Sequence, residues 1–163
     1  MKRLLIFVAA ALLAGCSSSS KPKVAAPAIH GPLGTMQTSL GQVLTDSAGK
    51  TIYRFAIDSV GHSACSGTCL QYWPPVPAPA GLPSTVPGVN AQLGSISRPD
   101  GAKQLTVAGY PVYTYASDKA PGDVAGQGLN LSGGLWWVIS STGAEVTNGP
   151  SASTGGGGGY GGY

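Results

Sequence analysis

Two short stretches of the 163-residue chain share one pattern and decide the fold: YRFAID at residues 53–58 and YTYASD at residues 113–118. Tyrosine, alanine and aspartate recur at an offset of 60 residues, and the third position is aromatic in both stretches. A self-similarity of this kind indicates a tandem duplication of one supersecondary unit. Upstream, the LG pair at residues 40–41 is matched with the LG pair at 93–94, which would make the second unit seven residues longer.

The alternation of side chains in each copy indicates β-strands. Tyr53, Phe55 and Ile57 fall on one face of a strand by the period of two residues, and Tyr113 and Tyr115 repeat this pattern. Turn signals rich in Asp, Gly and Pro precede both strands. The sequence therefore predicts a mainly β fold, in which two tandem related units of hairpin or meander type form one small domain.

Three further elements are expected in this domain. The second unit gains an extra strand at residues 104–107, and a last strand is expected at residues 136–140. The WW pair at the start of that strand loosely matches YW at residues 72–73. One short helical turn is expected between residues 66 and 72, because Pro74 disfavours helical backbone at the residue before it.

The two ends of the chain differ from the domain in composition. Residues 1–15 combine two basic residues with a short apolar run, which is typical of a secretory signal peptide. The run ends in LAGC, a pattern typical of a bacterial lipobox, so Cys16 is the expected lipid attachment site. Residues 16–35 are then a flexible tether, residues 36–147 the duplicated β domain, and residues 148–163 a disordered Gly/Tyr tail. An ordinary cleavage site with an unmodified Cys16 is the alternative.

The predicted signal peptide and the charge balance limit where the protein can be located and which partners it can bind. Without the signal peptide, the chain has seven Lys or Arg against six Asp or Glu, so no basic surface for nucleic acid remains. A palmitate-type lipid would anchor the protein to a membrane of the cell envelope. Ser17 implies the outer membrane in a Gram-negative cell; otherwise the outer face of the cell membrane is expected. An envelope protein or polysaccharide is the expected partner.

The stretch GHSACSGTC at residues 61–69 brings His62, Cys65 and Cys69 close together in sequence. Export through an oxidising compartment favours a disulfide, and on one helical turn the two Cα atoms would lie about 6 Å apart, within the range for such a bond. The same three residues could supply ligands for copper or zinc. Catalytic thiol chemistry is a third alternative. We favour the disulfide, and we expect no cofactor.

Asp58 and Asp118 take equivalent places in the two units and are candidates for a pair of catalytic carboxylates. The structural interpretation is favoured, because each follows a strand and can accept backbone N–H bonds in its own turn. Asp118 with Asp123 could hold a cation, although the Pro-Gly between them is typical of a turn. His62 is the only base that the domain offers to a nucleophile. We therefore expect no enzymatic activity.

Most aromatic residues of so small a domain are expected in its core. An exposed stacking surface for carbohydrate or haem is the alternative, and it would require several of these rings to be exposed together. The residues in question are Tyr53, Phe55, Tyr72, Trp73, Tyr113, Tyr115, Trp136 and Trp137.

The combined motifs indicate a family. The chain resembles bacterial predicted lipoproteins of the secreted-repeat type, which have a Tyr-x-aromatic-x-x-Asp motif. This motif occurs twice, at Tyr53/Phe55/Asp58 and Tyr113/Tyr115/Asp118, and Cys65-x-x-x-Cys69 before Trp73-Pro74-Pro75 and Arg98-x-Asp100-Gly101 also match. The resemblance implies a lipid anchor and duplicated β units, and it supplies no activity.

The sequence as a whole favours a lipid-anchored envelope protein that acts as a non-enzymatic structural or binding module. The alternative is a metal-binding or redox accessory protein that uses His62, Cys65 and Cys69.

Overall fold

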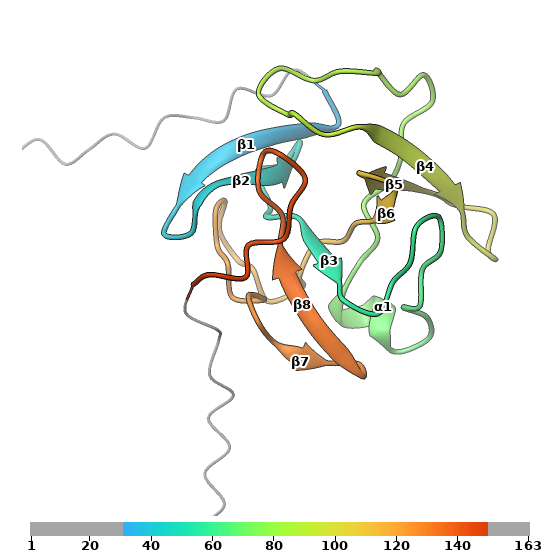
Figure 1. Ribbon diagram of the computed structural model, residues 1–163. Coiled ribbons are helices and arrows are strands. Elements are labelled where there is room, and N and C mark those ends of the chain that lie inside the picture. Colours follow the sequence, from blue (N-terminus) through green and yellow to red (C-terminus); the bar gives the residue numbers. More distant parts are fainter. Residues whose placement is uncertain (1–30, 150–163) are drawn as a thin grey trace, which may run out of the picture.

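The computed structural model describes residues 31–149 (Figure 1). The predicted signal peptide, Cys16, most of the tether and most of the tail lie outside these residues. The domain opens with an antiparallel hairpin of β1 (Leu33–Thr38) and β2 (Gly41–Asp46). The strand β1 therefore begins within the segment that was assigned to the tether. Its first residue, Leu33, is fully buried, so it belongs to the core of the domain.

The remaining strands form two antiparallel three-stranded sheets. One sheet contains, in chain order, β4 (Leu93–Ser97), β5 (Lys103–Val107) and β6 (Tyr110–Pro111). In the other sheet, β3 (Tyr53–Phe55) pairs with a strand from the far end of the domain, β8 (Gly134–Val138), which also pairs with β7 (Asn130–Leu131). Figure 1 shows β3 and β8 side by side although they are far apart in the chain.

These elements confirm a mainly β fold with one helical turn near the cysteine pair. This turn, α1 (Cys69–Tyr72), ends before Trp73 as predicted. Among residues 31–149, no helix has the length and apolar character that a membrane span needs. The expected face of the first motif strand was wrong at Ile57, which is 53% exposed. The strand ends at Phe55 because the chain turns there, with the N–H of Asp58 donating to the carbonyl oxygen of Phe55 at 3.0 Å.

The register of the two repeats also differs from the expected one. The LG pair at residues 33–34 opens β1 as the LG pair at 93–94 opens β4, so these two pairs are the counterparts. The LG pair at 40–41 instead follows the turn of the first hairpin. The strand β5 is therefore the counterpart of β2 and not an extra strand, and most of the assumed difference in length disappears.

The two repeats exchange backbone hydrogen bonds in a reciprocal manner. The N–H of Leu44 donates to Ile139 of the second repeat, and the N–H of Leu105 donates to Val76 of the first, both at 2.8 Å. Tyr53 and Tyr113 form a mutual pair of N–H···O bonds at 2.8 and 3.0 Å. Equivalent atoms thus face each other across an approximate two-fold axis that passes between these two tyrosines. The bonds also fix the downstream register, in which Trp73 corresponds to Trp136 rather than to the residue after it.

Aromatic side chains of both repeats stack at this axis. The rings of Trp73 and Trp136 are parallel, with centroids 3.8 Å apart. Phe55 stacks on Trp136 at 4.1 Å, and its counterpart Tyr115 stacks on Trp73 at 4.3 Å. The core interpretation of the aromatic residues is confirmed for these rings and for the fully buried Tyr53 and Tyr113. Tyr72 is an exception, because it is 49% exposed.

Candidate functional site

Each motif tyrosine bonds to the motif aspartate of the other repeat. The hydroxyl group of Tyr53 donates to Asp118 Oδ2, and that of Tyr113 donates to Asp58 Oδ2, both at 2.8 Å. The second carboxylate oxygen of each aspartate accepts a backbone N–H in its own loop, from Ala64 for Asp58 and from Ala125 for Asp118. The motif therefore joins the two repeats across the two-fold axis.

These contacts decide between the two interpretations of Asp58 and Asp118. The predicted backbone N–H bonds within each turn are present. The sequence did not reveal the tyrosine partners, which lie 55 and 65 residues away in the chain. Asp58 and Asp118 are 6% and 2% exposed, and each accepts a hydrogen bond from the other repeat's tyrosine. The geometry is that of a structural lock.

Burial changes the pKa values of the two aspartates and two tyrosines that form this lock. It raises the pKa of Asp118 to about 6, against the lowering effect of the Tyr53 hydroxyl and the Ala125 N–H. Burial also raises the pKa of Asp58, where the Ala64 N–H and the Tyr113 hydroxyl oppose it. The pKa values of Tyr53 and Tyr113 are raised as well, chiefly by burial. Both tyrosines consequently keep their protons and remain hydrogen-bond donors at neutral pH.

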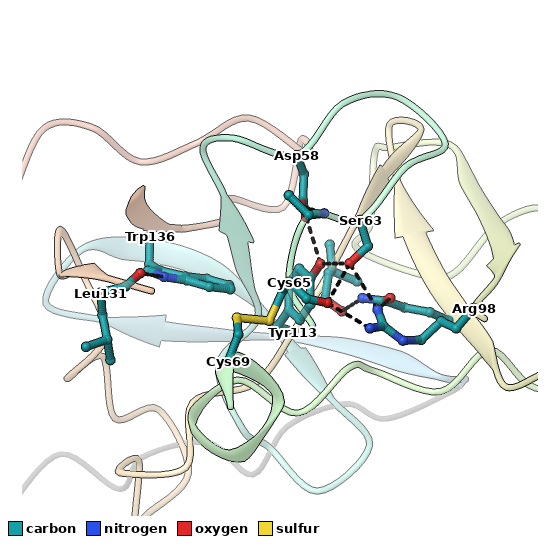
Figure 2. The surroundings of a disulfide bond; sticks show 11 residues. Asp58, Ser63, Cys65, Cys69, Arg98, Tyr113, Leu131 and Trp136 are labelled. Atoms are coloured by element: carbon teal, nitrogen blue, oxygen red, sulfur yellow. Dashed lines mark hydrogen bonds between the residues drawn. A yellow bond between two sulfur atoms is a disulfide. The ribbon is translucent and has the colours of Figure 1, made fainter. Parts of the chain in front are cut away.

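Cys65 and Cys69 form a disulfide, with Cα atoms 5.5 Å apart (Figure 2). The bond lies in the aromatic core cluster, and the two residues are only 1% and 6% exposed. The alternative of a metal site at His62, Cys65 and Cys69 is not supported, because sulfurs joined to each other are not thiolate ligands. Within residues 31–149, no group of three or more His, Cys, Asp or Glu is placed to hold a metal ion.

The second repeat has no room for an equivalent disulfide. The backbone N–H groups that reach the aspartates, of Ala64 and Ala125, align Cys65 with Gly126. A Cβ atom at Gly126 would lie 2.8 Å from ring atoms of both Trp73 and Tyr53, which is too close for any side chain. The cross-link is therefore confined to the first repeat.

A further departure from two-fold symmetry surrounds Arg98. This side chain is 8% exposed and extends from the end of β4 toward the loop before α1 (Figure 2). Its Nη1 donates to Ser63 Oγ at 3.0 Å and to Gln104 Oε1, and its Nη2 donates to the carbonyl oxygen of Cys65 at 2.8 Å. Ser63 Oγ also lies 2.7 Å from the Tyr113 hydroxyl, so Arg98 is connected through Ser63 to the Tyr113–Asp58 pair.

A cleft of about 290 Å³ opens beside this network. It separates the loop before α1 from the end of β4, and its lining includes the side chains of His62, Ser63, Ser66, Ser97 and Arg98. Arg98 also borders a second cleft of about 200 Å³. The residue therefore contributes to the lining of both clefts.

Sequence reasoning found part of this site. It grouped His62 and Cys65 in one short stretch as candidates for a disulfide or a metal site, and the structure places both residues at the cleft. It quoted Arg98 as part of a family motif without assigning it a role. The missed signal was the pattern itself: an arginine and a glutamine, six residues apart in a hairpin, stand at positions that are Thr38 and Val43 in the first repeat.

The family comparison agrees with the repeat structure. The chain belongs to a family described as a secreted repeat of unknown function, whose model matches residues 34–77 and 94–140. These two matches together cover more than half of the chain, and they begin at the two glycines that the structure identifies as counterparts. Neither the curated proteins nor the solved structures contain a match to the chain. The family description supports an extracellular or envelope location.

Proposed function

We propose that the protein is a lipid-anchored component of the cell envelope, in which the duplicated β domain acts as a non-enzymatic binding module. The anchor is Cys16, which the LAGC pattern marks as the lipidated residue. The observation that carries the binding role is the cleft at Arg98, which combines this cation with His62 and three serines and lies on a domain whose core is locked by cross-repeat contacts.

The arrangement of the carboxylates supports a role without catalysis. A pair of catalytic carboxylates must flank a substrate, with roughly 5–9.5 Å between the two groups. Asp58 and Asp118 are instead buried and bonded to tyrosines on either side of the aromatic stack. His62 is exposed on the cleft, and the hydroxyl of the adjacent residue, Ser63, is engaged by Arg98 and Tyr113.

The test of the anchor uses the protein purified from its native membrane. Mass spectrometry of this material is expected to show a mature N-terminus at Cys16 with its lipid, and an oxidised cysteine pair. The Cys16→Ala variant should accumulate as an unprocessed or mislocalised precursor. Normal maturation of that variant, with retention in the detergent phase, would show that the anchor is elsewhere.

The test of the binding role is cosedimentation of the mature protein with insoluble envelope polymer. Saturable binding to the polymer is expected, with no change in the polymer's chain length during incubation. Release of soluble fragments would indicate an enzyme. Failure to cosediment with any envelope fraction would remove the binding role and leave the anchor intact.

A further inference from the structure

Arg98 is a buried cation that no acidic residue neutralises within the described part of the chain. Its three hydrogen bonds go to neutral oxygens, on Ser63, Gln104 and Cys65. The only ion pair formed among residues 31–149 joins Arg54 and Glu145 instead. Withdrawing an unpaired ion from water costs several kcal/mol. A site that keeps such a charge next to a cleft is well suited to an anionic ligand.

The guanidinium group also has unused donors. An arginine has five N–H groups, and two on Nη1 and one on Nη2 are occupied. The N–H of Nε and the second N–H of Nη2 have no acceptor among the described residues. Nε is not among the buried polar atoms without a partner, so it retains contact with the surface, and Nη2 lies next to it on the same planar group. Two such donors match the two oxygens of one carboxylate.

The lining of the cleft is complementary to the same ligand. It contains three serine hydroxyls and the imidazole of His62 and no carboxylate. A second cation bonds to one of these serines, since Lys103 Nζ donates to Ser97 Oγ at 2.6 Å, although Lys103 itself lines the second cleft together with Asp100. The cleft is close to the lower end of the about 300–1,000 Å³ typical of ligand sites, so it accommodates a single sugar or amino-acid residue.

The first repeat shows that the fold does not need this cleft. Ile96 and Arg98 correspond to Met36 and Thr38, since Ile96 pairs with Gln104 as Met36 pairs with Val43. Met36 is 7% exposed and covers Gly122, where an added Cβ would lie 2.6 Å from its sulfur atom. The equivalent space is therefore filled by apolar packing in one repeat and left open beside a cation in the other.

We propose that the cleft at Arg98 binds a carboxylate on a single residue of an envelope polymer, either a uronic acid or the end of a peptide. This inference rests on the proposed binding role. Arg98 would hold the carboxylate through Nε and Nη2, while Ser66 and His62 contact the neighbouring hydroxyl or amide groups. A carboxylate is the class of anion that fits, because one guanidinium group neutralises one negative charge.

The test is an NMR titration of the mature full-length protein with glucuronic acid and with N-acetylalanine, and with the methyl ester of each as the uncharged control. We expect the acids to shift the backbone amides of residues 61–66 and 96–99 and the Nε–H of Arg98, and the esters not to. The stronger of the two acids identifies the source of the carboxylate. Equal shifts with acid and ester, or no shifts in these segments with either acid, would overturn the proposal.

Substitutions then test whether the charge in the cleft is responsible for binding of the carboxylate. Arg98→Lys keeps a cation but loses the planar fork, so binding should weaken at least tenfold. The matched control, Arg54→Lys, changes an arginine outside the cleft and should leave binding within twofold of the unaltered protein. If Arg98→Lys perturbs folding, Ser66→Asp with Ser66→Asn as its control tests the same charge at an exposed position. Unchanged binding in both Arg98→Lys and Ser66→Asp would refute the proposal.

The NMR titration tests the Arg98 cleft, and the cosedimentation assay tests the binding role, so a negative result in one can be told from a negative result in the other. Polymer binding that persists in Arg98→Lys leaves the binding role standing and removes the Arg98 cleft as its site. Loss of all polymer binding in the unaltered protein removes the binding role itself.

Discussion

The two repeats share the same arrangement of strands and motif contacts. They differ in what holds the loop after the motif in place. The loop that follows the first motif is held by a disulfide and reaches Arg98 through the carbonyl oxygen of Cys65. The loop that follows the second motif has Gly126 at that position and lies directly on the aromatic stack. The contacts of tyrosine, aspartate and tryptophan are thus common to both repeats. Features present on one side only are candidates for function.

A second difference lies within the aromatic stack. The indole N–H of Trp136 donates to the carbonyl oxygen of Leu131 at 2.9 Å (Figure 2). The indole N–H of Trp73 is buried and has no acceptor among the described residues. Trp73 and Trp136 therefore differ in their hydrogen bonding although their rings take equivalent places in the aromatic stack.

The largest expected effect comes from removing either ring of the central stack. Trp73→Ala and Trp136→Ala should each lower the free energy of unfolding by about 3–5 kcal/mol, because both side chains are fully buried. Chemical denaturation measures the change. The phenylalanine variants sharpen the comparison: Trp136→Phe also loses a hydrogen bond, so it should cost about 1 kcal/mol more than Trp73→Phe. The reverse order would contradict the assigned difference between the two indoles.

The next largest effect is expected at the cross-repeat lock. Tyr53→Phe leaves Asp118 without its hydroxyl donor, and Tyr113→Phe does the same to Asp58. Each should cost about 1–3 kcal/mol, since a buried polar group then lacks a partner. Either substitution should weaken the whole domain, because the lost bond joins both repeats. Cooperative unfolding is the control, and loss of structure in a single repeat would show that the lock is local.

The disulfide should contribute less to the free energy of unfolding than the Tyr–Asp lock and the aromatic stack together. In the chain-entropy model, a bond that closes a loop of five residues stabilises by about 2 kcal/mol. The double variant Cys65→Ala/Cys69→Ala should therefore melt at a lower temperature and still fold. Thiol titration of the natively exported protein supplies the control, with no free thiol expected from this pair. Two free thiols with stoichiometric copper or zinc would revive the metal-binding alternative.

The smallest effect concerns pH and separates the two aspartates. The pKa of Asp118 is raised from 3.8 to about 6 in the folded protein, so the folded state favours the protonated form. The stabilisation from this proton is complete below pH 3.8 and is lost as the pH rises through about 6. Between pH 7 and pH 5, stability should thus increase by about 1 kcal/mol from this residue.

The control for this pH effect is a pair of matched amide variants. Asp118→Asn should remove most of the gain, and Asp58→Asn should remove less, because the Ala64 N–H, the Tyr113 hydroxyl and the charges of His62 and Arg54 all counteract the rise in the pKa of Asp58. Urea unfolding at both pH values measures the difference. Asp123 does not interfere in this window, because its pKa is lowered by the N–H groups of Ala120 and Lys119. An identical pH response in the two variants would contradict this assignment.

The sequence predicted the elements better than their register. The tyrosine, alanine and aspartate of the motif identified the duplication, because a motif that closes a shared core must recur unchanged. The LG pair at 40–41 misled the alignment, since the glycine that opens β2 and the glycines near the starts of β1 and β4 look the same in a sequence. Ile57 was misplaced because the period of two says nothing about where a strand ends.

The candidate site was less predictable than the fold. The disulfide followed from the spacing of Cys65 and Cys69 and from the secretory leader. The partners of Asp58 and Asp118 did not, because reciprocal contacts between repeats depend on how the two units dock. Arg98 was equally hidden: its burial results from packing between the loop at residues 61–66 and the end of β4, two segments more than 30 residues apart.

The reciprocal Tyr–Asp bonds make each repeat depend on the other for its hydrogen-bond partners. Each repeat lacks the acceptor for its own tyrosine and obtains it from the other, as the subunits of a symmetric homodimer do. The chain is in this sense a dimer fused into one polypeptide, with the segment at residues 78–92 as the covalent link that raises the effective concentration of the two halves. Cutting that link should yield two fragments that reassociate rather than two independent domains.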